Sequence, residues 1–386
     1  MSDSRPAAAL PPHIQNIEQL REHLQAAIEL EHSTIPPYLC GLYTIRQDAI
    51  RLDIDPPGPN LMAAEIIRTV VVEEMLHMML ASNVLNAVGG APSIDHSKFV
   101  PAYPATLPIG TGKPLVVNLL KFSEEAIDTF LAIERPLPPP PVKVATRRLR
   151  ALAPVPVPPG QLVDMVRRGE LYGSIGEFYA AIELGLQGLE ARARAQGGTI
   201  FIGSPDRQIT REYYYNSGGE AFPVTDLESA LTALREIVDQ GEGYDNGIFD
   251  DDFQEFGQQK SLAHYYRFNQ IKLGRTYVQG DTPKSGPSGP PIPISYAPEA
   301  VYDMIPNPSL DRLPEGAVRD GGLAFSRIYT ELLRMIDRAV NGEPEQLVPA
   351  VVQMFTLKDS AIDLIRNPLP EGHNAGPCFE YSGEQE

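Results

Sequence analysis

The sequence predicts a mainly α-helical protein built on a four-helix bundle, with long Pro- and Gly-rich crossover loops and extra C-terminal helices. Apolar residues recur at helical spacing in several long segments. These segments alternate with stretches rich in the 38 prolines and 32 glycines, which break helices and form turns. Acidic and His side chains lie on otherwise apolar helix faces, which indicates a buried polar site.

The bundle helices are expected in order along the chain. The first, over residues 16–48, has Asn16 as its N-cap and a kink where Pro36 and Pro37 interrupt the pattern. The second, over residues 61–88, is apolar almost all round, as expected of a central helix. Further helices are expected over residues 123–134, 173–196, 226–240, 260–271, 322–341 and 344–366.

The composition shows no clean break into independent domains. We expect residues 14–275 to form the bundle, with a Pro-rich inserted loop at 136–160 and an acidic, Gly-rich one at 243–260. Residues 276–386 are expected to add a loop and helices that pack on the bundle within the same structural domain.

The charge balance narrows the range of partners. A formal net charge of −18, from 50 acidic and 32 basic residues, repels the phosphates of nucleic acids and anionic lipids. We therefore expect neither nucleic acid nor a membrane as a partner. The two cysteines, Cys40 and Cys378, exclude a disulfide framework, so a reducing cytoplasm is the expected location.

The sharpest motif is the tetrapeptide from Glu74 to His77. Positions i and i+3 of a helix lie on one face, so this carboxylate and this imidazole can reach the same cation. The surrounding VVVEEMLHMMLASNVL is almost entirely apolar, which predicts burial. A buried carboxylate is unfavourable unless it is paired or coordinated, so either a metal ion or a basic partner is required.

Three further helices place an acid or a His on an apolar background. These are Glu31 in ELEH on the first helix, Glu177 in GSIGEFYAAIELGL on the third, and His264 in SLAHYYRF on the fourth. Four long helices that each offer such a group inward have the pattern of the di-iron carboxylate bundles.

The fourth helix departs from that pattern, because Ser261 and not Glu stands three residues before His264. In one interpretation the sixth ligand is missing. In the other, which we prefer, residues 243–260 loop out and split the motif, so that Glu242 supplies the carboxylate.

Neighbouring groups are alternative ligands. Glu29 and His32 are expected to be exposed, and Glu183 to form a salt bridge on a helix face. Glu73 stands i to i+4 from His77 and could replace the acid beside it. Three tyrosines near the site could hydrogen-bond the ligands or carry radicals, although core packing is the commoner role: Tyr38, Tyr179 and Tyr265.

Several longer motifs together resemble one family. They are ELEHSTIPPYLCGLYTI, VVEEMLHMMLASNVLNAVGGAP, GSIGEFYAAI, the pair QGEG and SLAHYYRF, and the ending AGPCFEY. From about residue 14 to 382, the chain resembles the ferritin-like domain of the iminophenyl-pyruvate dimer synthases of violacein and rebeccamycin biosynthesis. The pathway synthases are longer and linked to haem, so the chain resembles a stand-alone member. The ligands that the resemblance implies are Glu31, Glu74, His77, Glu177, Glu242 and His264.

The expected cofactors are two metal ions, iron or alternatively manganese, because carboxylate and imidazole ligands suit these metals. We see no haem or nucleotide motif. The resemblance implies an oxidoreductase that uses dioxygen or peroxide on a small organic substrate, with oxidative coupling of aromatic keto-acid imines as the family-level expectation. The alternative is a non-enzymatic metal-binding or metal-free scaffold. A homodimer is left open.

Overall fold

The computed structural model describes residues 10–11, 13–46, 59–107, 115–136, 171–172, 175–214, 218–243, 247–250 and 261–383. Its helices are α1 (Ile17–Thr44), α2 (Leu61–Ala87), α3 (Glu124–Ile133), α6 (Ile175–Ala195), α7 (Leu227–Glu242), α9 (His264–Leu273), α10 (Ala317–Val340) and α11 (Leu347–Ile365). Short 3-10 turns lie at Ser97–Phe99, Pro205–Arg207, Leu310–Arg312 and Pro344–Gln346. Strands β1 (Ala105–Leu107) and β2 (Leu115–Val117) form a small antiparallel sheet, with Thr106 opposite Val116. The mainly helical prediction is confirmed.

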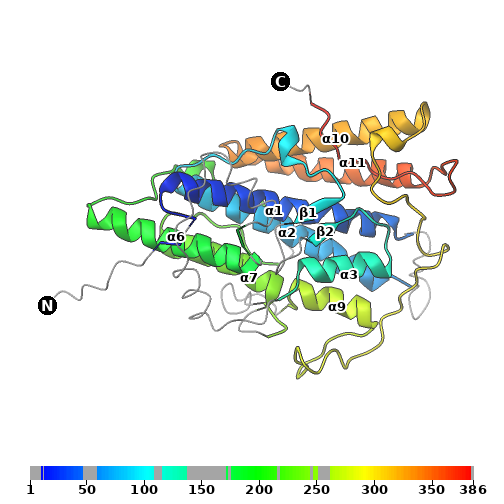
Figure 1. The fold of residues 1–386 in the computed structure, drawn as a ribbon, viewed down its shortest axis with the longest axis horizontal. Coiled ribbons are helices and arrows are strands. Elements are labelled where there is room, and N and C mark those ends of the chain that lie inside the picture. The colour runs from blue at the N-terminus through cyan, green and yellow to red at the C-terminus, as the bar shows by residue number, and fades with distance from the viewer. Residues whose placement is uncertain are drawn as a thin grey trace.

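The long helices α1 and α2 pack against each other and form the centre of the bundle (Figure 1). The side chain of Asn16 caps α1 by accepting from the backbone N–H of Gln19 at 2.9 Å, as the sequence predicts. The helix continues through Pro36 and Pro37. Helix α2 is buried along most of its length. No helix in the described ranges is long and apolar enough to cross a membrane.

The other two helix positions of the bundle are each shared by two shorter helices. Helices α6 and α7 pack together along one part of the α1–α2 pair, and α3 and α9 pack together along another (Figure 1). Residues from the end of α3, the start of α6 and the end of α7 line one cavity: Ile133, Ile175 and Gly241. The breaks in the two helix positions therefore meet at the same place in the bundle.

The expected insertion at 243–260 begins where α7 ends. Gly243, with φ at 98°, follows the helix, and a left-handed backbone there favours glycine. An antiparallel bridge pairs Phe249 with Leu262, and the N–H of Ala263 donates to Ile248 at 3.1 Å. Residues 248–250 therefore lie beside residues 261–263, next to the start of α9. Residues 251–260, and all but the first residue of the expected loop at 136–160, lie outside the described part.

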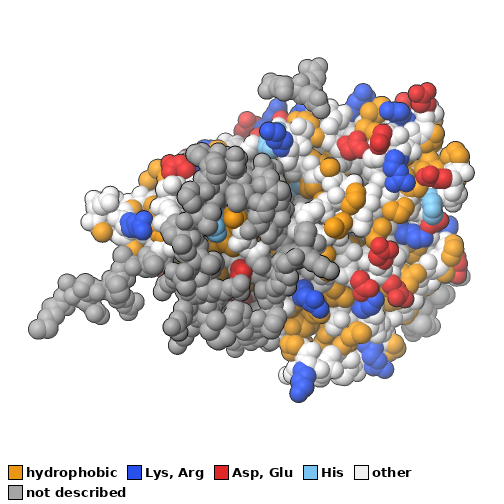
Figure 2. Space-filling view, in the orientation of Figure 1, with side chains coloured by type: hydrophobic (Ala, Val, Ile, Leu, Met, Phe, Trp, Pro, Cys, Tyr) orange, Lys and Arg blue, Asp and Glu red, His pale blue; other side chains and the backbone are white. Residues whose placement is uncertain are grey.

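The C-terminal helices α10 and α11 form a hairpin that packs on α1 and α2 (Figure 1). The hydroxyl of Tyr329 on α10 lies 2.7 Å from Nε2 of His32 on α1 and makes a buried polar link between the two layers. On the described part of the face shown in Figure 2, acidic, basic and apolar side chains are interspersed.

Candidate metal centre

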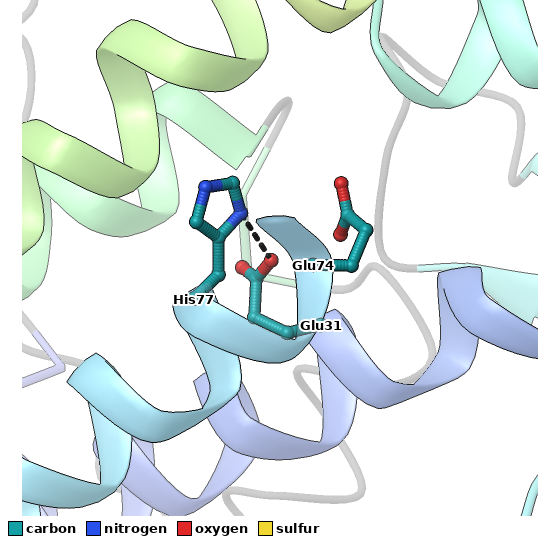
Figure 3. Close-up of side chains that lie close together, drawn as sticks. All are labelled: Glu31, Glu74 and His77. Carbon is teal, nitrogen blue, oxygen red and sulfur yellow. Dashed lines mark ion pairs between the residues drawn. The ribbon is translucent and has the colours of Figure 1, made fainter. Parts of the chain in front are cut away.

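A first cluster of metal-type ligands lies between α1 and α2. Glu31, Glu74 and His77 are each no more than 5% exposed, and one ligand atom of each lies within 4.8 Å of the others. Nδ1 of His77 is 3.3 Å from Oε2 of Glu31 across the two helices (Figure 3). Because Glu74 and His77 stand one turn apart on α2, both point to the same side of that helix.

A second cluster shares Glu74 with the first. It adds Glu134, which caps the C-terminus of α3, and His264, the first residue of α9. Nδ1 of His264 lies 2.9 Å from Oε1 of Glu74 and 3.6 Å from Oε2 of Glu134. The imidazole rings of the two clusters stack with centroids 5.4 Å apart. The two clusters are therefore adjacent, with Glu74 between them.

Hydroxyl groups hold the outer oxygen of each carboxylate. Tyr179 donates to Oε1 of Glu31, Tyr38 to Oε1 of Glu134, and Thr34 to Oε2 of Glu74 at 2.9 Å. In each case the other carboxylate oxygen faces a His nitrogen. The hydroxyls thus fix which oxygen each acid offers to the centre.

Both imidazoles present Nδ1 to the centre. Nε2 of His264 lies 2.9 Å from Oε2 of Glu73, and an ionised carboxylate can only accept, so this nitrogen donates. Nε2 of His77 lies 2.9 Å from Oε1 of Gln240. The amide of Gln240 is oriented by Glu236, because its nitrogen donates to that carboxylate at 2.8 Å. A neutral imidazole that donates through Nε2 carries its lone pair on Nδ1, the atom that faces the clusters.

The clusters suit metal ions in size and spacing. Ligand atoms about 2.1 Å from one cation and at right angles lie roughly 3 Å apart, close to the 2.9, 3.3 and 3.6 Å separations found here. Nδ1 of His264 is buried. Carboxylate oxygens of Glu74 and Glu134 lie close to it, but neither contact has the geometry of a hydrogen bond. A cavity of about 30 Å³ lies among the ligands, and one water needs roughly 10–15 Å³, so it has room for ions or water. Carboxylate and imidazole donors in this arrangement suit iron or manganese.

The same crowding perturbs the pKa values of the ligands. Burial, and then the charge of Glu134, raises the pKa of Glu74 to about 7. Burial alone would lower the pKa of both imidazoles, but nearby carboxylates reverse this. Interaction with the carboxylate of Glu31 raises the pKa of His77, and the nearby carboxylates of Glu134 and Glu73 raise that of His264 well above its usual value. In the metal-free protein, protons therefore occupy the centre near neutral pH.

Metal binding at pH 7 is expected to release protons, because the raised pKa values of His77 and His264 leave a proton where a cation would sit. Affinity for a divalent metal should therefore rise with increasing pH, as the protons on these imidazoles are lost. Calorimetric titration in two buffers of different ionisation enthalpy measures the released protons. An observed heat that does not depend on the buffer contradicts this expectation.

The structure brings together four of the six ligands expected from the sequence: Glu31, Glu74, His77 and His264. Glu177 is half-buried near the start of α6 and belongs to neither cluster, whereas Tyr179 of that helix reaches Glu31. Glu242 is the last residue of α7, and its side chain lies outside the described part. The metal-binding role of these residues stays a prediction.

Glu134 is a cluster residue that the sequence analysis missed. It follows an apolar face of α3 made by Ile127, Phe130 and Ile133, and it precedes the Pro-rich segment. The available signal was an acid at the end of an apolar helix face, four residues after Phe130. No His or second acid stands at ligand spacing nearby, so this signal did not distinguish Glu134 from a surface group.

Two expectations about neighbouring residues were wrong. Glu29 and His32 were expected to be exposed, but they are only 7% and 3% exposed. Phe99 and Tyr329 cover the ring of His32. The hairpin of α10 and α11 packs on α1, and this contact between distant parts of the chain was not visible in the helical pattern.

Glu73 belongs to neither cluster and instead has buried polar partners on α9. It accepts from His264 and from Nη1 of Arg267 at 2.8 Å. Burial would raise the pKa of Glu73, but the positive charge of Arg267 and the bond to His264 hold it below its usual value. Glu73 therefore orients His264 rather than replacing Glu74 in the clusters.

Comparisons with known proteins support this architecture. The chain is 27% identical over 332 residues to dichlorochromopyrrolate synthase of Lentzea aerocolonigenes. The aligned region covers 80% of this chain but only 29% of that longer protein. A crystal structure of a ferritin-like protein from Caulobacter vibrioides matches with a TM-score of 0.55 at 21% identity, covering 96% of this chain and 100% of that one. A sequence model of the ferritin-like family matches residues 24–273. The chain belongs to the ferritin-like family.

Proposed function

We propose that this protein binds two iron ions at the paired clusters and acts as an oxidoreductase on a small organic substrate. The observation that carries the proposal is the position of Glu74, which lies within ligand distance of both His77 and His264. One carboxylate shared by two sets of buried oxygen and nitrogen donors is the arrangement that holds two cations side by side.

The chain's own residues supply position, charge and exclusion of water. Three buried acids, Glu31, Glu74 and Glu134, offset the positive charge of the ions, and the two imidazoles fix the directions of approach. Two iron ions at this position would supply the redox capacity to reduce dioxygen or peroxide. Apolar side chains also line the cavity and limit its contact with water: Ile133, Ile175, Ile237 and Val238.

Oxidative coupling is the reaction class that the comparisons favour. The similar protein is a synthase whose name refers to a chromopyrrolate, and the sequence motifs resemble those of the iminophenyl-pyruvate dimer synthases. Joining two imines of an aromatic keto acid through a new carbon–carbon bond removes two electrons and two protons. Peroxide takes up both and forms two waters, so the reaction balances with one peroxide for each dimer.

A second function is favoured by the size of the cavity. The described residues leave a cavity of about 30 Å³ among the ligands, which is room for ions or water. Metal binding without conversion of an organic substrate fits this volume. The two functions share the same metal centre and differ in whether a substrate is consumed.

Metal analysis and oxidant consumption test the proposal in sequence. Protein from iron-supplemented cells is expected to hold about two equivalents of iron, as the shared-carboxylate arrangement implies. Fewer than about 0.5 equivalents of any transition metal would contradict the proposal at its base. With metal present, dioxygen or peroxide should be consumed when aromatic keto-acid imines are added. Consumption that is unchanged in the His77→Ala/His264→Ala variant would assign it to another source.

A further inference from the structure

The two histidines of the centre are supported differently behind their metal-facing nitrogens. Nε2 of His264 donates to the carboxylate of Glu73, whereas Nε2 of His77 donates to the amide oxygen of Gln240, each at 2.9 Å. We propose that this difference makes the metal position at His264 the tighter one, so that it fills first. The inference rests on the proposed two-metal function and adds an order of binding to it.

The charge of Glu73 distinguishes the two positions. Glu73 is 1% exposed, and Arg267 donates to its other oxygen at 2.8 Å, so its charge is compensated without the loss of its bond to His264. A hydrogen bond to an ionised acceptor is roughly twice as strong as one to a neutral acceptor. Such a bond makes the opposite ring nitrogen a better electron-pair donor, which strengthens its bond to a metal.

The amide of Gln240 gives weaker support to His77. Its oxygen is neutral, and its nitrogen is engaged by the buried carboxylate of Glu236 at 2.8 Å. On this side of His77, the side chain of Gln240 stands between Nε2 and the negative charge of Glu236. At His264, the charged carboxylate of Glu73 contacts Nε2 directly. Glu73 and Gln240 act as positioning residues, since each contacts the imidazole nitrogen that faces away from the ligand clusters.

Titration of metal-free protein with Mn²⁺ is expected to show two phases. Loss of a supporting carboxylate typically changes metal affinity by about 10- to 100-fold, so the two phases should differ by a factor in that range. Two assignments follow from the geometry. His264→Ala should remove the tight phase and leave the weak one, and His77→Ala should do the reverse.

Neutralising the support of His264 is the sharper test. In Glu73→Gln/Arg267→Met both charges of the Glu73–Arg267 pair are removed together, so that Glu73 is not left charged without its guanidinium partner. The tight phase should weaken by about 10-fold while the weak phase stays unchanged. The matched control is Glu65→Gln/Arg68→Met, an exposed pair on the same α2 helix, which should leave both phases as they are.

The outcomes separate the inference from the function on which it depends. Two indistinguishable phases in the wild-type protein, or loss of the tight phase in His77→Ala, would overturn the order of binding. Equal weakening of both phases in the Glu73→Gln/Arg267→Met variant would reassign that pair to general stability and also overturn it. A wild-type protein that binds no Mn²⁺ and no Fe²⁺ would instead contradict the two-metal function itself.

Discussion

Replacing Glu74 by Gln is expected to remove both metal ions at once, because this carboxylate is within ligand distance of both clusters. Glu31→Gln and Glu134→Gln each change one cluster and should leave about one equivalent of metal. Elemental analysis of the three variants, purified from the same iron-supplemented medium, gives the comparison. The matched control is Glu65→Gln, an exposed acid on the same helix, which should retain the wild-type content.

The Glu74→Gln variant should also be more stable than the wild type when both are metal-free above pH 7. The pKa of Glu74 is about 7 in the folded protein, above its ordinary value of 4.5, because of burial and the charge of Glu134. A group with a raised pKa contributes stability below pH 4.5 and loses it as the pH rises through 7. The ionised acid then opposes folding of the metal-free protein, and Gln removes this effect. In the elemental analysis of the purified variants, equal metal content in Glu74→Gln and Glu31→Gln would contradict the proposal that Glu74 binds both ions.

Arg267→Met is expected to destabilise the protein by about 3–5 kcal/mol, because it removes the guanidinium that pairs with the buried carboxylate of Glu73. Arg267 donates to Glu73 at 2.8 Å, lies 3.6 Å from Asp250, and also bonds the carbonyl of Leu262. It therefore ties α2 to the start of α9 and to the base of the insertion. Urea unfolding at pH 7 in the presence of a chelator isolates this effect from metal binding.

Two controls make the Arg267 result specific. Arg68→Met removes an exposed partner of Glu65 on α2, and such a surface pair contributes at most about 1 kcal/mol. Glu73→Gln/Arg267→Met should recover part of the lost stability, since the side chain at position 73 then carries no charge that requires the guanidinium. A loss for Arg267→Met no larger than that for Arg68→Met would show that Glu73 is stabilised by other groups.

The fold and half of the centre follow from local sequence patterns. The spacing of Glu74 and His77 on an apolar helix placed both on one buried face, and the same argument brought in Glu31. Asn16 marks the start of the first helix through a side-chain bond to the backbone that is local. These features depend on residues within a few turns of each other, which a sequence displays directly.

The other half depends on contacts between distant segments. Helix α3 matches the short helix expected at 123–134, but only its packing beside α9 brings Glu134 to His264. Gln240 reaches His77 only because α7 packs on α2. Tertiary packing decides which of several similar acids is turned inward, so Glu177 and Glu134 could not be distinguished by helical periodicity alone.

Anomalous X-ray scattering at the iron edge tests the central claim most directly. Crystals of protein from iron-supplemented cells should show two peaks flanking the carboxylate of Glu74. One peak should lie beside Glu31 and His77, and the other beside Glu134 and His264. Well-ordered density for these five side chains without an anomalous peak, or with peaks only elsewhere in the molecule, would contradict the two-metal centre.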